Sequence, residues 1–262
     1  IGLAGELGAG ITLVAETMHK EKRGYGTMII VTFGALGAVL AGLVGTEGHV
    51  VAEFLTANTG YTFQNWQVVY LIGGFLGILL LILRVGAFES GMFKSMQHHQ
   101  VSKGDFFALF KTAENRSKYL YCILIGLPIW YIIGVLVSLS QDVFGKELGI
   151  NGIVNGKAVM FAYIGLSVGD LISGLLSQLL RSRRKVVFLY LIFTSLLVLY
   201  FIFGAHGITV SQYYFVCFLL GLASGYWAIF VTIASEQFGT NIRSTVTNTV
   251  PNFVRGAVLP IT

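Results

Sequence analysis

The feature that most constrains this chain is a run of 50 residues, 186–235, without a single Asp, Glu, Lys or Arg. A helix needs about 20 predominantly apolar residues to cross a bilayer, so this run is long enough for two spans. We expect the break between them at residues 204–207 and 211–212. Charged residues make up only 11% of the chain, against about 25% in ordinary soluble domains. The sequence therefore predicts a polytopic membrane protein.

Four further charge-poor runs have the length of one span each. They cover residues 24–46, 67–83, 119–141 and 157–180, and the last contains Asp170 in its interior. Residues 1–14 and 245–262 are apolar but short, and we expect the chain to be a fragment whose ends lie inside helices. The expected fold is all-α, with six complete spans and two partial ones.

Basic residues mark alternate connections between the expected spans. Fourteen of the 17 Lys and Arg residues fall in segments 18–23, 84–118, 181–185 and 236–244. The intervening connections hold only Lys146 and Lys157, and Arg255 falls inside the last span. Since cytoplasmic loops carry an excess of Lys and Arg, we expect the first set of segments to face the cytoplasm. This clustering explains the net charge of +5 better than nucleic-acid binding does.

Two stretches of the chain are related by an offset of 220 residues. Residues 5–27 and 225–247 share five identities without a gap: Gly5/Gly225, Thr12/Thr232, Glu16/Glu236, Arg23/Arg243 and Thr27/Thr247. In each copy a glutamate ends one helix and an arginine seven residues later opens the next. Parallel repeats joined by a cytoplasmic loop are typical of a large class of secondary transporters.

Three motifs carry a likeness to a known family. They are the hairpins Glu16/Arg23 and Glu236/Arg243, the stretch Gly174-Leu-Leu-Ser-Gln178-Leu-Leu-Arg181-Ser-Arg183-Arg184-Lys185, and Phe88-Glu89-Ser90-Gly91-Met92-Phe93. On these motifs the chain resembles a major facilitator superfamily transporter, with weaker likeness to the sugar and metabolite:proton symporters. It departs from the family pattern at three positions, where Gln178 replaces aspartate, Arg181 replaces the second glycine of the loop and Gly91 replaces proline.

The resemblance implies a two-half helical bundle that is incomplete at both ends and covers roughly helices 4–11 of twelve. Residues 1–84 would belong to the first half, 85–118 would form the central cytoplasmic loop, and 119–262 would belong to the second half. It also implies an integral multi-pass protein of a bacterial inner membrane, acting as a monomer. Its partners would be a small-molecule solute, a proton or other coupling ion, and the lipid bilayer.

Three ionisable residues are expected near the middle of the membrane. A rise of about 1.5 Å per residue places Asp170, Arg255 and Glu6 roughly 17–21 Å from the cytoplasmic ends of their helices. Such residues usually face a cavity. We take Asp170 and Glu6 as candidate proton-coupling carboxylates and Arg255 as the candidate site for an anionic group of the solute. The alternative is a structural ion pair between Arg255 and one of the acids. Asn252, three residues before Arg255, is a further candidate for this polar site.

A second set of charged residues lies at the expected cytoplasmic helix ends. We interpret them as a gate that holds the two halves together and must open during transport: Glu16, Arg23, Glu236, Arg243, Arg181, Arg183 and Arg184. For the cluster of residues 181–185, a plain topology signal is an equally good explanation.

Small and aromatic residues complete the prediction. Gly165-x-x-x-Gly169 and Gly221-x-x-x-Gly225 favour close helix packing. Trp130 and Trp227 suit either a cavity lining or anchoring at the membrane interface.

The function favoured is secondary active transport by alternating access, coupled to protons. A transporter-like receptor that binds a solute without moving it is the alternative. We expect no enzyme, cofactor or metal site, because the sequence shows no intramembrane catalytic or metal-binding cluster and no ATP-binding motif.

Overall fold

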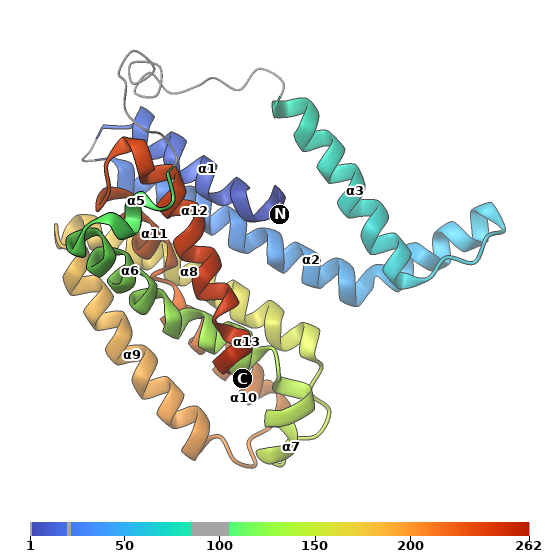
Figure 1. Cartoon of the computed structure of the whole chain (residues 1–262). Helices are drawn as coiled ribbons and strands as arrows, with labels where there is room; N and C mark the ends of the chain where they lie inside the picture. Colours follow the sequence, from blue (N-terminus) through green and yellow to red (C-terminus); the bar gives the residue numbers. More distant parts are fainter. Residues whose placement is uncertain (1, 20–21, 85–104, 262) are drawn as a thin grey trace.

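A computed structural model describes residues 2–19, 22–84 and 105–261, and all regular secondary structure in this part of the chain is helical. The helices are α1 (Gly2–Thr17), α2 (Arg23–Thr59), α3 (Asn65–Arg84), α5 (Ala108–Lys111), α6 (Ala113–Tyr131), α7 (Gly145–Glu147), α8 (Asn155–Leu179), α9 (Arg183–Gly204), α10 (Val210–Ser224), α11 (Trp227–Glu236), α12 (Thr240–Gly256) and α13 (Val258–Ile261). Two π-helical segments, Ile132–Val137 and Ser140–Phe144, continue α6 (Figure 1). The stretch 88–93 lies outside the described residues.

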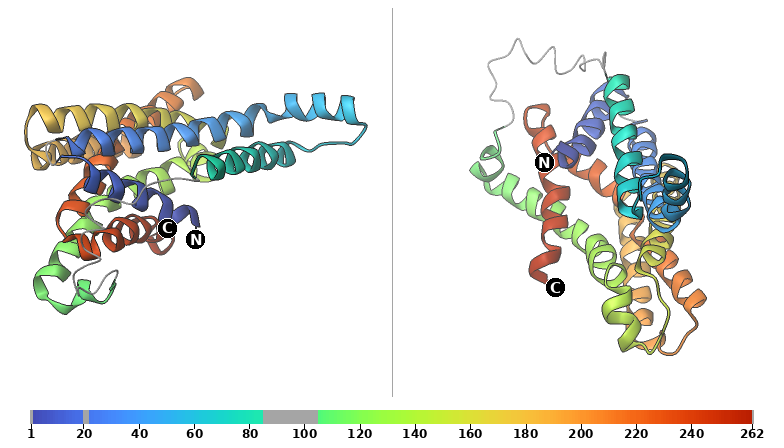
Figure 2. Two further views of the ribbon diagram at one scale, coloured as in Figure 1. Left: turned by 90° about the horizontal axis from the view of Figure 1, so that it is seen from above. Right: turned by 90° about the vertical axis from the view of Figure 1, so that its right-hand side faces the viewer.

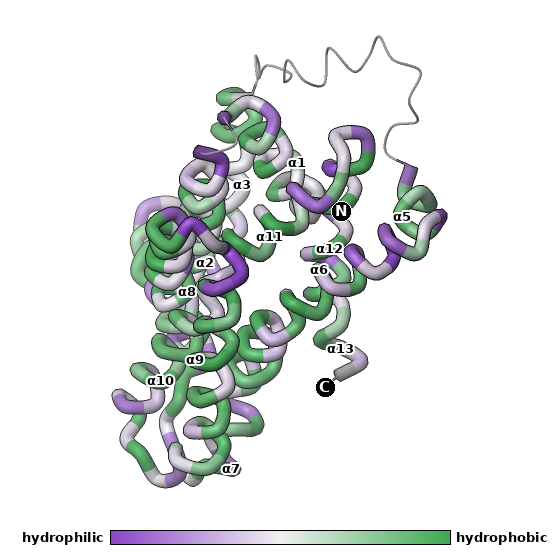
Figure 3. The backbone as a smooth tube through the Cα atoms, turned by 90° about the vertical axis from the view of Figure 1, so that its left-hand side faces the viewer, coloured by the Kyte–Doolittle hydropathy of each residue, from purple (hydrophilic) through white to green (hydrophobic). Residues whose placement is uncertain are grey.

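The six predicted complete spans are confirmed. Six helices or helix pairs in the described residues are long and apolar enough to cross a membrane: Arg23–Thr59, Asn65–Leu83, Ala113–Val137, Asn155–Leu179, Arg183–Gly204 and Val210–Glu236. Figure 3 shows the hydrophobic colouring that runs along most of the bundle, with hydrophilic residues gathered at the turns.

The long uncharged run breaks where α9 ends at Gly204 and α10 begins at Val210. The expected second breakpoint at residues 211–212 is wrong, because these residues form the first turn of α10. Thr209 caps that turn: its hydroxyl accepts a hydrogen bond from the Gln212 N–H, and the Gln212 side chain accepts one from the Thr209 N–H. This capping box starts the helix at Val210, before the break that composition suggested.

Helix α2 is longer than the predicted span. It continues without interruption through Glu47 and Glu53 to Thr59, so most of the expected loop at residues 47–66 is helical. The helix ends at Gly60, which adopts a left-handed backbone with φ 71° and donates its N–H to the Thr56 carbonyl. Helix α3 begins beside Gly48 of α2, and α3 and the C-terminal part of α2 extend away from the bundle (Figure 1).

The close packing predicted for the two small-residue motifs is confirmed, and the structure shows that the motifs pack against each other. A Cβ atom added to Gly221 would lie under 3.0 Å from the Ala162 carbonyl oxygen, and one added to Gly165 would come as close to the Phe218 carbonyl oxygen. Gly169 and Gly225 approach equally closely, backbone to backbone. Helices α8 and α10 therefore cross with no room for side chains between them.

Elements of residues 2–84 pack against elements of residues 113–261 along two lines of contact. Helix α1 lies against α12, and α2 lies along α8, as the two further views in Figure 2 also show. Near one end Met28 of α2 packs on Gly174 of α8, and near the other Met160 of α8 packs on Gly42 of α2. A cavity lies between these two sets of helices.

Candidate functional site

A cavity of about 590 Å³ lies between the two sets of helices. Its lining comes from α1, α2, α6, the following π-helical segment, α8, α11 and α12. Most of the lining is aliphatic side chains and glycine, and two of the lining residues carry a charge: Asp170 and Arg255. The structure therefore brings together two of the three ionisable residues that the sequence placed at mid-membrane depth.

Asp170 has no solvent-exposed surface. Its Oδ1 atom accepts a hydrogen bond of 2.9 Å from the backbone N–H of Ala228, and the N–H of Trp227 also donates to the carboxylate. These two N–H groups belong to the first turn of α11, where α10 and α11 are separated by Gly225 and Tyr226. A carboxylate at this position satisfies open N–H groups and complements the positive end of the helix dipole. The other oxygen, Oδ2, has no hydrogen-bond partner among the described residues.

The guanidinium group of Arg255 lies against two indole rings. Its guanidinium carbon is 4.8 Å from the ring centroid of Trp130 and 5.6 Å from that of Trp227. The two rings are edge-to-face, with centroids 5.8 Å apart. Arginine over an aromatic face is attracted by the ring quadrupole, which partly compensates for the loss of water. No described carboxylate forms a salt bridge with Arg255, and its Nε atom and Trp130 Nε1 are both buried without a hydrogen-bond partner in the described part of the chain.

The other two candidates for this site have different outcomes. Glu6 belongs to α1, but its side chain lies outside the described residues. Asn252 donates to the Asn248 carbonyl at 2.7 Å and lines a separate groove with Phe253 and Pro260. The structure does not bring Asn252 to the cavity, because the offset of about 60° between positions three apart is enough to turn it to another face of α12.

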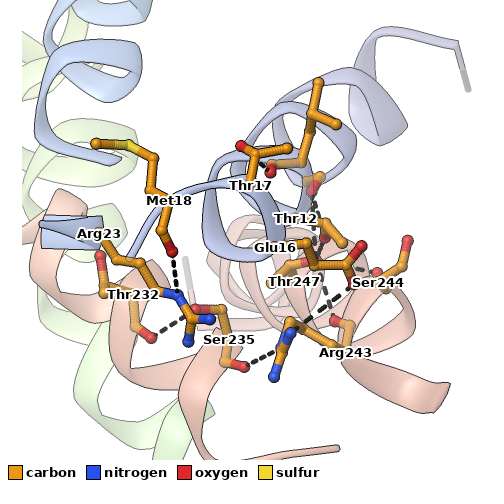
Figure 4. Close-up of polar contacts among 12 residues, drawn as sticks. Thr12, Glu16, Thr17, Met18, Arg23, Thr232, Ser235, Arg243, Ser244 and Thr247 are labelled. Atoms are coloured by element: carbon orange, nitrogen blue, oxygen red, sulfur yellow. Dashed lines mark hydrogen bonds and ion pairs between the residues drawn. The ribbon is translucent and has the colours of Figure 1, made fainter. Parts of the chain in front are cut away.

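The gate candidates gather at one end of the bundle, which we call the basic end (residues 16–23, 181–185 and 236–243). Glu16 of the first hairpin pairs with Arg243 of the second, with 3.8 Å between the guanidinium Nη1 and carboxylate Oε1. Both side chains are nearly buried, and Arg243 Nε donates to the Ser235 carbonyl at 2.9 Å (Figure 4). One helical turn away, the hydroxyls of Thr12 and Thr247 are hydrogen-bonded at 2.9 Å. An ion pair and a hydrogen bond thus join the first hairpin and its helix α1 to the second hairpin and its helix α12.

The remaining gate candidates do not repeat this pairing. Glu236 forms an ion pair with Arg183 at the start of α9, and Arg23 donates to the Met18 carbonyl at 3.2 Å. Arg181 and Arg184 form no salt bridge with a residue that the structure describes. Arg181 instead has a left-handed backbone, with φ 48°. That is the conformation for which glycine is suited, and Arg181 occupies the position where the resembled loop has its second glycine.

Sequence reasoning left the roles of Trp130 and Trp227 open and did not identify Tyr163, which also lines the cavity. Their placement depends on which face of α6, α8 and α11 turns inward, and these helices are apolar on all sides. One signal in the sequence could have pointed to the aromatic lining residues: they lie at about the same depth in their helices as Asp170 and Arg255.

The fold and cavity define a class of protein: a helical membrane protein with a cavity between two sets of helices. A family model described as Major Facilitator Superfamily matches residues 1–256. The chain therefore belongs to the major facilitator superfamily, whose members are membrane transporters of small solutes. Comparison with curated proteins finds no significant match, and comparison with solved structures finds none either.

Proposed function

We propose that this protein is a secondary active transporter that works by alternating access and couples solute movement to protons. The observation that carries the proposal is that Asp170 and Arg255 line one cavity between the two sets of helices. A fixed cation and an acid that can take up a proton are the two components that proton-coupled transport of an anionic solute requires.

Arg255 supplies the binding site for the anionic group. Arginine keeps its charge and presents a rigid fork of donors that matches a carboxylate or phosphate. In this cavity the guanidinium is held by Trp130 and Trp227, without a described carboxylate beside it. A solute anion provides the counter-charge that the described residues do not.

Asp170 supplies the proton site. Because it has no exposed surface in this conformation, proton exchange with water requires the surrounding helices to move. A buried carboxyl that exchanges protons only when the cavity opens ties protonation to the transport cycle.

The basic end supplies the gate. The Glu16–Arg243 pair and the Thr12–Thr247 hydrogen bond join α1 to α12, so they must break before the cavity can open at that end. The conformation described here corresponds to a bundle closed at its basic end, with the charge distribution assigning that end to the cytoplasm.

The test is uptake and counterflow in proteoliposomes containing the full-length protein. We expect an imposed pH gradient to drive solute accumulation, and Asp170→Asn to abolish this accumulation while leaving solute exchange intact. Asp142→Asn is the matched control, because Asp142 is exposed and lies outside the cavity. Uptake with full pH dependence in Asp170→Asn would contradict proton coupling through this residue. Binding without counterflow would contradict transport itself.

A further inference from the structure

The cavity wall also restricts the chemistry of the solute. We infer that the solute is a monovalent organic anion with an apolar body, such as a monocarboxylate, rather than a sugar or a polyanion. This inference rests on the proposed function, because it concerns the same cavity.

The charges of the lining indicate a single anionic group. Among the described residues that line the cavity, Arg255 is the one cation and Asp170 the one acid. A solute with two anionic groups would place the second in a cavity that offers no other described cation and contains the Asp170 carboxylate. Like charges in a low-dielectric site repel strongly, so a monoanion is favoured over a dianion.

Two unpartnered donors indicate a carboxylate. Arg255 Nε and Trp130 Nε1 are both buried without a partner among described residues, and the guanidinium carbon is 4.8 Å from the Trp130 ring centroid. Both atoms are enclosed in this conformation, so a small movement of the two side chains is needed before they can donate to a bound group. A carboxylate has two oxygens that accept hydrogen bonds, so it can then satisfy both donors. Buried donors are rarely left unsatisfied, which makes a bound acceptor group the natural complement of this pair.

The rest of the wall indicates an apolar body. Leu7, Ile30, Val31, Ile129, Ile133 and Leu166 are representative of the lining. A sugar carries several hydroxyls, each of which loses its hydrogen bonds to water on entry and finds no partner on an aliphatic side chain. The two indole rings that would otherwise stack on a sugar are already in contact with Arg255.

The experiment is isothermal titration calorimetry of the full-length protein in nanodiscs with four probes: 2-naphthoate, 2-naphthamide, 2,6-naphthalenedicarboxylate and glucose. The three naphthalene compounds share one apolar body and differ in charge. We expect 2-naphthoate to bind at least about tenfold more tightly than the amide or the dicarboxylate, a difference of about 1.4 kcal/mol, and glucose not to bind. Trp130→Phe removes the Nε1 donor and keeps an aromatic face, so 2-naphthoate affinity should fall about fivefold or more. Trp66→Phe, on exposed α3, should leave affinity unchanged.

Binding of glucose, equal binding of the amide, binding of the dicarboxylate as tight as that of the monocarboxylate, or no binding of 2-naphthoate would each overturn the inference. An unchanged 2-naphthoate affinity in Trp130→Phe would overturn the paired-donor site. These outcomes are separate from failure of the proposed function. A protein that binds 2-naphthoate selectively but shows no counterflow keeps the inference and loses the transport proposal, whereas proton-driven uptake of glucose does the opposite.

Discussion

The carboxylate of Asp170 on α8 accepts a 2.9 Å hydrogen bond from the backbone N–H of Ala228 on α11. The acid proposed to bind the proton is thus also the cap of a broken membrane helix. Protonation removes the charge that faces the positive end of α11, and Trp227, the first residue of α11, contacts Arg255. A continuous set of contacts therefore links the proton site to the anion site.

The capping role of Asp170 can be separated from its charge with two neutral variants. Asp170→Asn keeps an oxygen that accepts from the Ala228 N–H, whereas Asp170→Leu leaves that N–H without an acceptor. We expect the Leu variant to be less stable than the Asn variant by about 0.5–2 kcal/mol, the usual cost of losing a helix cap. Thermal unfolding of the purified protein in one detergent measures the difference. Equal melting temperatures would show that α11 does not depend on this cap.

The crossing of α8 and α10 should tolerate no added methyl group. In Gly221→Ala the new Cβ would collide with the Ala162 carbonyl oxygen, which belongs to the backbone and cannot turn away. We expect a loss of about 1–3 kcal/mol of stability, as for other overpacked cores. Gly37→Ala is the control: its Cβ meets no atom within 4 Å, so the better helix propensity of alanine should stabilise α2 by up to about 1 kcal/mol. Similar melting temperatures for both variants would contradict the close crossing.

The Glu16–Arg243 pair predicts that exchanging its two charges restores the transport activity lost in a single variant. Glu16→Arg places two guanidinium groups side by side in a nearly buried position, and we expect uptake to fall at least about tenfold while expression is retained. The double variant Glu16→Arg/Arg243→Glu restores opposite charges and should recover much of the activity. The same exchange at the exposed pair Glu114–Lys118 should have no effect. If the double variant is no better than the single one, these two residues do not act as a pair.

The left-handed backbone of Arg181 predicts that its replacement by glycine stabilises the protein. Its φ of 48° is costly for any residue with a Cβ atom, by about 1–2 kcal/mol, and glycine adopts it freely. Because glycine also makes the unfolded chain more flexible, we expect a net gain of about 0.5–1 kcal/mol for Arg181→Gly. Arg181→Ala removes the same charge but keeps the Cβ atom, and it should show no gain. A melting temperature for the glycine variant no higher than for the alanine variant would contradict the prediction.

The spans could be predicted from the sequence because a charge inside the bilayer is expensive, so charge-free runs report helices directly. The interruption of the last complete span at Gly225 and Tyr226 could not, because both residues are compatible with an apolar helix. That break depends on a tertiary contact with Asp170 and Gly169. The length of α2 was missed for the opposite reason: Glu47 and Glu53 end the apolar run but not the helix.

For the candidate site, depth along the helices was enough to expect Asp170 and Arg255 at one level, and the structure places both on one cavity. Depth does not determine which face of a helix a residue occupies. It therefore did not show that Asn252 lines a separate groove, and it left the roles of Trp130 and Trp227 undecided. The hairpin motifs identified Glu16 and Arg243 as important without showing that they meet. Their contact joins residues 227 positions apart, and only the packing of α1 against α12 creates it.

The pairing of the first hairpin with the second has a consequence for assembly. Glu16 of the first hairpin and Arg243 of the second form a nearly buried ion pair, although the two residues are far apart in the sequence. This pair is complete only when residues 2–84 dock on residues 113–261 in the register of the native bundle. Whether Glu16 and Arg243 meet therefore distinguishes correct docking from misdocking.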